Sequence, residues 1–215
     1  MKTPLANSGP TPDPAPERRT QIVVLVVLAA LLGALTWWSL RPPGRSEALI
    51  AWADFAPPES TAVRPWTWLV IHHSGARTGT VATIDAWHRK RGWDGIGYHV
   101  VVGNGVDMAL GEIAFTFRWR LQREGAHAGS GQQQHPYNEL GIGVCLIGNF
   151  DAAAPDPWQL DRTADLCAEL IRHVPTLSVG RIVAHGEVPG KQTSCPGSQL
   201  DVERLRLMVR QRLER

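Results

Sequence analysis

Three residues far apart in the sequence have the types and positions of a catalytic metal site. His72 and His185 each follow a short apolar run, and Cys195 lies in the Thr-Ser-Cys-Pro-Gly segment after His185. Two imidazoles and a thiolate suit zinc, and three protein ligands leave the fourth tetrahedral position open for water. Zinc lowers the pKa of such a water to about 7, which makes it a nucleophile. Any one of these residues alone would more often be structural, so the combination is what predicts a hydrolytic zinc site.

The elements that must position these residues alternate between strands and helices. We expect strands over 68–72, 97–102, 142–147 and 181–185, and helices from Thr83 to about residue 91, over 157–174, and from Asp201 onward. Thr83 and Asp201 are the predicted N-caps, and Asn104-Gly105 is typical of a hairpin turn.

The order of these elements predicts the fold class. The run 142–147 is apolar throughout, as in a central strand that is covered on both faces. We therefore expect one α/β domain with a central mixed β-sheet flanked by helices. Both histidines would then lie at strand ends, the rim where open α/β sheets place their sites.

The segment before this domain has a different composition. Residues 1–20 are polar and rich in proline, which predicts a disordered cytoplasmic tail. Residues 22–40 carry no charge, and as a helix they would span about 28 Å, close to the hydrocarbon thickness of a bilayer. We therefore predict an N-terminal transmembrane helix over 21–40, a Pro/Ala-rich linker over 41–64, and the folded domain over 65–215.

Flanking residues favour a retained anchor over its alternatives. A cleaved signal peptide is usually shorter and ends in small residues, whereas this segment ends in Trp37-Trp38, as an interfacial aromatic belt would. A buried core helix is disfavoured by the adjacent polar tail. Arg18 and Arg19 before the span give a small bias towards an inside N-terminus, which places the domain on the extracytoplasmic side.

Charge and cysteine content exclude some classes of protein. There are 22 basic and 20 acidic residues, so nothing indicates electrostatic capture of nucleic acid. Three cysteines cannot form a fully paired disulfide framework. If Cys195 binds metal, Cys145 and Cys167 are either reduced and buried or joined to each other. The nine tryptophans could line a sugar groove, although such residues more often fill cores.

Several segments between residues 66 and 201 resemble the zinc N-acetylmuramoyl-L-alanine amidases, the group that contains the phage amidase-type lysozymes and the peptidoglycan recognition proteins. The matching segments are VIHHS (70–74), WH and GW (87–93), IGYH (96–99), GAHA (125–128), YN (137–138), GIGVCLIGNF (141–150), HGEV (185–188) and CPG (195–197). They occur in the family's order. The resemblance does not cover the first 60 or so residues.

The resemblance implies roles for residues around the metal. It implies that His72, His185 and Cys195 bind Zn²⁺, and that the hydroxyl of Tyr98 orients the attacking water or stabilises the tetrahedral intermediate. Thr193 falls where relatives carry Lys or Thr and would donate a hydrogen bond to the developing oxyanion.

Further roles are implied in the substrate groove. His127 and Asn138 match positions that line the groove in relatives, and His73 would contact substrate or pack. Lys191 competes with Thr193 as oxyanion donor, because the loop is two residues longer than in the most similar branch. Cys145 stands where another branch has a glutamate base, and we interpret it as a small buried hydrophobe.

These implications lead to one expected function and three alternatives. We expect a zinc amidase that cleaves the bond between N-acetylmuramic acid and L-alanine in peptidoglycan and is anchored in a bacterial cell membrane with its catalytic domain on the periplasmic side. The alternatives are a non-catalytic module that binds muropeptides, a structural zinc domain, and an amidase restricted to soluble wall fragments. Recognition modules typically lose a zinc ligand, commonly the cysteine, whereas all three ligand positions are filled here.

Overall fold

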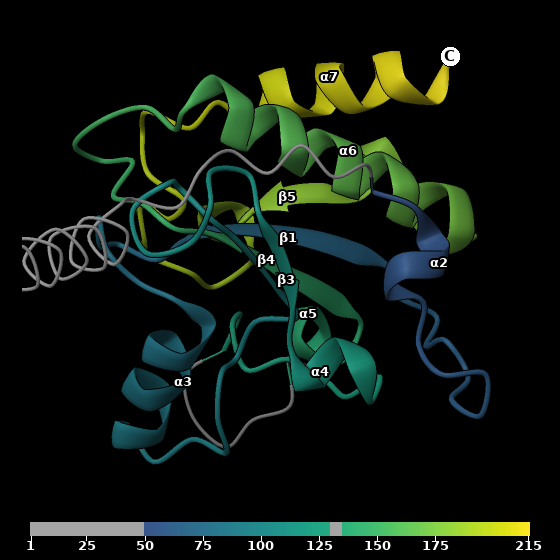
Figure 1. The fold of residues 1–215 in the computed structure, drawn as a ribbon, viewed down its shortest axis with the longest axis horizontal. Helices are drawn as coiled ribbons and strands as arrows, with labels where there is room; N and C mark the ends of the chain where they lie inside the picture. Colours follow the sequence, from purple (N-terminus) through teal and green to yellow (C-terminus); the bar gives the residue numbers. More distant parts are fainter. Residues whose placement is uncertain (1–49, 130–134) are drawn as a thin grey trace, which may run out of the picture. The chain divides into compact units, whose positions relative to one another are not determined.

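A computed structural model describes residues 50–129 and 135–215 (Figure 1). The predicted tail (1–20), the predicted transmembrane helix (21–40) and the first part of the predicted linker lie outside these residues. Among the helices that the structure does describe, none is both long and apolar enough to span a bilayer.

The centre of the domain is a five-stranded mixed sheet in the order β3-β2-β4-β1-β5. Its strands are β1 (Trp68–His73), β2 (Val100–Val102), β3 (Ile113–Phe115), β4 (Gly141–Leu146) and β5 (Ile182–Ala184). All neighbouring pairs are parallel except β2 and β3, which form an antiparallel pair. The predicted α/β class with a mixed central sheet is confirmed, although β3 was not predicted.

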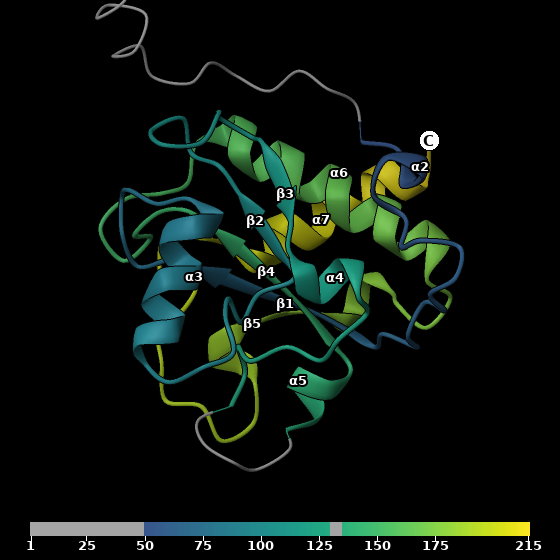
Figure 2. The same ribbon diagram turned by 60° about the horizontal axis from the view of Figure 1, so that its bottom comes forward.

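Helices cover both faces of this sheet. They are α2 (Trp52–Phe55), α3 (Val81–Lys90), α4 (Phe117–Arg120), α5 (Pro136–Glu139), α6 (Pro157–His173) and α7 (Val202–Leu213), with 3-10 turns η1 (Val179–Arg181) and η2 (His185–Glu187). Figures 1 and 2 show α6 and α7 on one face, and α3 and α5 on the other.

Strand β4 is central because apolar side chains cover both of its faces. Every residue of β4 is buried. Val144 packs with residues of α6 and α7 in the larger core cluster, whereas neighbouring Val101 of β2 packs with Ile84 of α3 in a second cluster. Each fully buried aliphatic side chain of this kind contributes roughly 1.5–3 kcal/mol to folding. The prediction of a central, doubly covered strand is confirmed.

The predicted element boundaries are partly corrected. Asp201 caps α7 as predicted, because its carboxylate accepts a hydrogen bond from Arg204 N at 3.0 Å. Helix α3 begins earlier than predicted, because Thr80 is the N-cap. Its hydroxyl accepts a hydrogen bond from Thr83 N at 3.2 Å, and its backbone N–H donates to Thr83 Oγ1 at 2.5 Å. Strand β2 is shorter than predicted, since the Gly97 N–H bonds to the His88 side chain instead of joining the sheet.

The second half of the predicted linker packs on the domain. Trp52 of α2 stacks on His173 of α6 with ring centroids 4.8 Å apart, and Phe55 is only 7% exposed. The backbone carbonyl of Phe55 accepts a hydrogen bond from Trp119 Nε1 at 2.6 Å. Phe55 is thus buried and Trp52 partly buried despite their Pro/Ala-rich surroundings. Part of the segment predicted as a linker over 41–64 therefore packs on the domain through Trp52 and Phe55.

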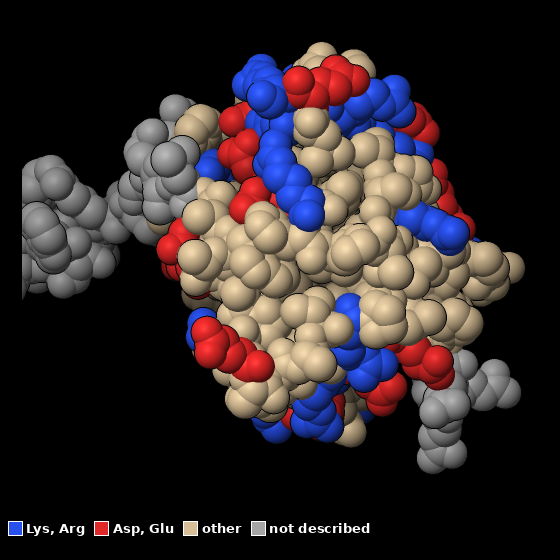
Figure 3. All heavy atoms as spheres, turned by 90° about the vertical axis from the view of Figure 1, so that its right-hand side faces the viewer, with Lys and Arg blue, Asp and Glu red and all other residues tan. Residues whose placement is uncertain are grey.

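Charges of both signs are mixed over the surface. On the face shown in Figure 3, basic and acidic side chains lie side by side around a broad uncharged area. Arg206 and Arg212, for example, each form ion pairs with two carboxylates. This mixture agrees with the formal net charge of +2.

The buried His99 predicts how stability depends on pH. Its Nδ1 accepts a hydrogen bond from Gly143 N at 2.9 Å, and its Nε2 donates to Arg123 O at 3.0 Å, so the neutral ring is fully bonded. Burial is the main cause that lowers the pKa of His99 to about 3, well below its ordinary value of 6.5.

Between these two pKa values the unfolded chain binds more protons at this site than the folded chain. The stability that His99 contributes is therefore complete above about pH 6.5 and is lost as the pH falls towards 3. Urea unfolding of the metal-free protein at pH 7, 5.5 and 4.5 should show falling stability, with a shallower decline in His99→Gln. Equal stability at all three pH values would contradict this expectation.

Candidate metal centre

Two parallel strands bring His72 and His185 together. In the register of β1 and β5, Ile71 pairs with Ala184, so the next residue of each chain segment is a histidine at the same edge of the sheet. Their ring centroids are 4.5 Å apart. The predicted meeting of two strand-end histidines is therefore present, although η2 begins at His185 itself.

The loop after β5 turns back to bring Cys195 to the histidines. The Gly186 N–H donates to Cys195 O at 2.8 Å. A Cβ atom at Gly186 would lie 2.6 Å from Thr193 O, so only glycine permits this close approach. Cys195 Sγ then lies 3.7 Å from His72 Nδ1.

The spacing of these donor atoms fits a zinc ion. One donor atom each from His72, His185 and Cys195 lies within 4.8 Å of the other two. Zinc–nitrogen and zinc–sulfur bonds of about 2.05 and 2.3 Å at a tetrahedral angle separate sulfur and nitrogen by about 3.6 Å, close to the observed 3.7 Å. In the described part of the chain this donor group has three members, which leaves a fourth position for water or substrate.

Burial lowers the pKa values of the two histidine ligands and raises the pKa of the cysteine. It is the main cause that lowers the pKa of His185 to about 4 and that of His72 well below its ordinary value, so both rings are neutral and keep a lone pair. Burial also raises the pKa of Cys195 to about 11. A buried thiolate here needs a neighbouring cation, which is what a bound metal supplies.

His127 is a hydrogen-bonding partner of His72, the first of the three predicted zinc ligands. Its Nδ1 is 3.0 Å from His72 Nε2, and its Nε2 is 3.1 Å from Gly141 O. The side chain is buried, and burial is the main cause that holds its pKa well below the ordinary value. Both ring nitrogens of His127 therefore have partners within the protein, and its predicted place in the substrate groove stays a prediction.

Tyr98 lies beside the donor group. Its ring centroid is 5.0 Å from that of His72. Together with Ser74, Trp87, His88 and Arg91 it lines a cavity of about 100 Å³.

Tyr98 also interacts electrostatically with Cys145, which is the register partner of His72 on β4. Burial is the main cause that raises the pKa of Tyr98 well above 10, and the nearby Cys145 and Cys195 add to this shift. Tyr98 is therefore a protonated donor at neutral pH. Cys145 was predicted only to pack as a small hydrophobe, and no pattern in the sequence indicates its influence on Tyr98.

The side chains of three other predicted site residues accept hydrogen bonds from backbone N–H groups. His73 Nδ1 accepts a hydrogen bond from Phe150 N at 3.1 Å. Asn138 Oδ1 accepts from His127 N at 2.8 Å and from Ala128 N at 2.7 Å. Thr193 is exposed, and its hydroxyl accepts from Cys195 N at 3.2 Å. Their roles towards substrate or oxyanion stay predictions.

All three cysteines are free thiols. Cys145 and Cys167 are both fully buried. Of the two alternatives left open by the sequence, the reduced and buried pair is therefore the correct one.

Asp151 stabilises the loop that carries Cys195, called the cysteine loop below, and this role was not predicted. Its carboxylate accepts hydrogen bonds from Ser194 Oγ at 3.0 Å and from Ser198 N at 3.3 Å. Asp151 follows β4 in a run of turn-forming residues, which gives no sequence signal for this long-range contact.

Gly197 packs directly on the same turn, which gives a testable prediction. Its φ is +101°, and a Cβ would lie 2.4 Å from Phe150 C and 2.6 Å from Asp151 N. Gly197→Ala must therefore displace the loop that carries Cys195. We expect a loss of about 1–3 kcal/mol in unfolding free energy together with weaker zinc binding. Gly180→Ala is the control, because a Cβ there meets nothing within 4 Å. Equal thermal stability of the two variants would contradict the expectation.

Comparisons with known proteins agree with this geometry. The sequence model of the Amidase_2 family, described as N-acetylmuramoyl-L-alanine amidase, matches residues 62–198. The endolysin of Klebsiella phage KP32 is 28% identical over 126 residues, which cover 56% of this chain and 71% of the endolysin. The match to peptidoglycan-recognition protein SD of two Drosophila species spans only about half (52%) of those proteins' length.

Solved structures show the same fold. The N-acetylmuramoyl-L-alanine amidase LysC from Clostridium intestinale has a TM-score of 0.56 and 25% identity, covering 68% of this chain and 86% of LysC. A variant of Drosophila PGRP-LB in complex with tracheal cytotoxin has a TM-score of 0.50 and 24% identity, covering 72% of this chain and 91% of PGRP-LB. Because the family model matches more than half of the sequence, the chain belongs to the Amidase_2 family of N-acetylmuramoyl-L-alanine amidases.

Proposed function

We propose that this protein is a zinc-dependent amidase that hydrolyses the bond between N-acetylmuramic acid and L-alanine in peptidoglycan. The observation that carries the proposal is the convergence of His72, His185 and Cys195 at one edge of the sheet, with donor spacing that suits zinc. Membership of the amidase family supports the same reaction class.

The metal and the residues around the donor group would have different roles in this reaction. A bound zinc would supply Lewis-acid polarisation of the scissile carbonyl and activation of water. Tyr98 keeps its proton at neutral pH and is placed to donate a hydrogen bond to the carbonyl oxygen as negative charge develops on it. Thr193 lies on the cysteine loop, where its hydroxyl would assist in the same way.

The predicted location and partner belong to this proposal. Intact peptidoglycan lies outside the cytoplasmic membrane, so an anchor over 21–40 with the domain on the periplasmic side would place the enzyme next to its substrate. The complex of PGRP-LB with tracheal cytotoxin supports a peptidoglycan fragment as ligand. We propose no nucleic-acid partner.

The main alternative is a domain that binds peptidoglycan without cleaving it. Such a domain needs neither a complete donor set nor a hydroxyl beside it. Here the three donors are in place, and Tyr98 lies next to His72. This arrangement favours the hydrolase.

Mass spectrometry of digested sacculi tests the proposal. The full chain, in detergent, should release stem peptides with a free N-terminal L-alanine, and a chelator should stop the release until zinc is restored. Binding to sacculi without release would support the recognition domain. Cleavage of small muropeptides but not of sacculi would identify an enzyme for soluble fragments. Unfolding by the chelator would indicate a structural zinc domain.

A further inference from the structure

We propose that His127 is a positioning residue that fixes His72 in the tautomer whose Nδ1 faces the metal. The inference rests on the proposed zinc site and assigns His127 a role other than contact with the substrate. It follows from a chain of two hydrogen bonds, from His72 to His127 and from His127 to the Gly141 carbonyl.

The direction of this chain is set by its last member. A carbonyl oxygen only accepts hydrogen bonds, so His127 Nε2 must carry a proton and donate it to Gly141 O, 3.1 Å away. The neutral ring then has a bare Nδ1, which accepts from His72 Nε2–H at 3.0 Å. His72 Nδ1 is consequently unprotonated, and this is the nitrogen that lies 3.7 Å from Cys195 Sγ.

The reverse direction would require a buried cation. If His127 donated from both nitrogens it would be an imidazolium, and the charge would lie in a site that is only 6% exposed. Among the described residues, no Asp or Glu forms an ion pair with His127 that could compensate it.

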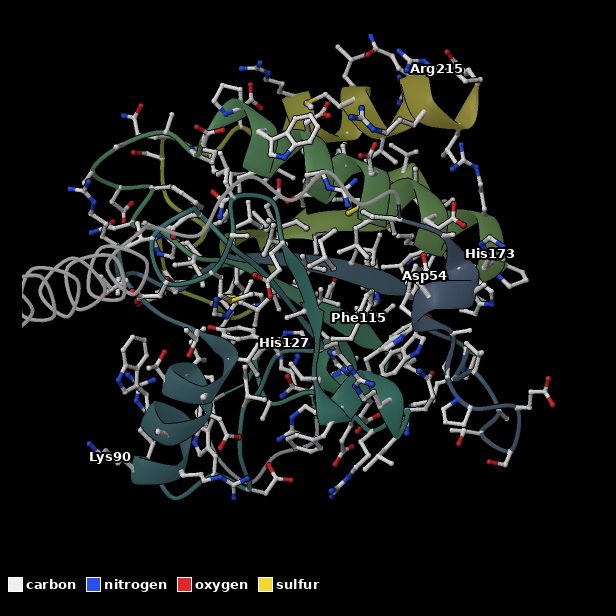
Figure 4. All side chains as sticks on the ribbon, in the orientation of Figure 1. Asp54, Lys90, Phe115, His127, His173 and Arg215 are labelled. Carbon is white, nitrogen blue, oxygen red and sulfur yellow. The ribbon has the colours of Figure 1, made fainter. Side chains whose placement is uncertain are left out.

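The ring of His127 is held in a fitted slot. A Cβ at Gly143 or Gly125 would lie 2.5 or 2.3 Å from His127 Cδ2, so both glycines make room for the imidazole. Asn138 fixes the backbone of His127 through its side-chain oxygen. Figure 4 shows His127 on the side of the sheet that carries α3. A fixed ring can hold its hydrogen-bond partner in one orientation.

A role in orienting His72 and a role in binding substrate predict different effects of replacing His127. A partner that orients a metal-binding histidine typically changes metal affinity by about 10–100-fold when it is replaced. A residue that contacts only the substrate would change KM and leave zinc affinity unaltered.

A pair of amide variants separates the two contacts of His127. In His127→Asn the amide oxygen takes the place of Nδ1 and can still accept from His72. In His127→Gln the amide nitrogen takes the place of Nε2 and keeps the bond to Gly141, but no acceptor faces His72. His99→Gln is the matched control, because His99 is also buried and doubly bonded but has no bond to His72.

The measurement is the zinc dissociation constant of the full chain in competition with a chromophoric chelator, with the visible spectrum of the cobalt-substituted protein as a second readout. We expect His127→Gln to weaken zinc binding by about 10–100-fold, and His127→Asn and His99→Gln by clearly less. The cobalt bands should shift in His127→Gln only.

Each other outcome overturns a specific claim. Unchanged zinc affinity with a raised KM in both His127 variants would overturn the inference and assign His127 to the substrate. Equal losses in His127→Asn, His127→Gln and His99→Gln would show that packing alone matters, which also overturns it. If the unaltered protein bound no zinc, the proposed function itself would fail, a result distinct from these two.

Discussion

Replacing Cys195 with alanine should abolish peptide release from sacculi and leave a domain that is folded but binds zinc poorly. Structural zinc sites with four ligands provide about 10–16 kcal/mol, or about 2.5–4 kcal/mol for each ligand. Loss of the thiolate should therefore weaken zinc binding by roughly 10²–10³-fold. Dialysis against limiting chelator followed by metal analysis measures the loss, and the digestion assay measures the activity.

Cys167→Ala provides the matched control for this variant. Cys167 is a free, fully buried cysteine of α6 in the larger core cluster, and the metal centre does not include it. We expect Cys167→Ala to lose some stability but to keep its zinc and its activity. If Cys195→Ala retained normal zinc content and normal peptide release, the assignment of Cys195 as a ligand would be wrong.

Tyr98→Phe should lower kcat by about 10²–10³-fold while leaving zinc affinity unchanged. The phenol is a protonated donor next to His72, and its removal takes away one hydrogen bond to the developing oxyanion. Because this bond strengthens mainly in the transition state, KM should change little. Steady-state kinetics on a defined muropeptide, with metal analysis of the same sample, checks both parts.

The chain has one other tyrosine, which serves as the control. Tyr137 stacks on Trp68 with ring centroids 4.7 Å apart, and Tyr137→Phe should keep kcat within about twofold because no step is assigned to its hydroxyl. Tyr98→Phe with full activity would remove Tyr98 from the mechanism. Loss of zinc in Tyr98→Phe would instead make it a residue that supports the metal site.

Much of the metal site could be predicted because its ligands follow local patterns. The apolar runs before His72 and His185 predict strands, and parallel strands of one sheet end at the same edge. The continuous apolar run of β4 predicts a strand buried on both faces. The cap at Asp201 is equally local, since its bond reaches only to Arg204.

Other features depended on contacts between distant segments. Trp52 and Phe55 lie in a Pro/Ala-rich stretch whose composition is typical of a linker. They nevertheless contact His173 and Trp119, which are more than 60 positions away in the sequence. The short strand β3 is set by pairing with β2, since three residues carry too little periodicity to be predicted. Asp151 likewise reaches Ser194 only because the turn after β4 and the cysteine loop meet in space.

The sequence by itself determined the family, the mixed α/β fold and the three donor types, because each of these is carried by residue type and short-range periodicity. Only the tertiary structure decided which nitrogen of His72 faces Cys195 and that the other nitrogen of His72 lies against His127. Hydrogen-bond direction and side-chain contact depend on atoms that the fold brings together from distant parts of the chain, and spacing along the sequence does not record them.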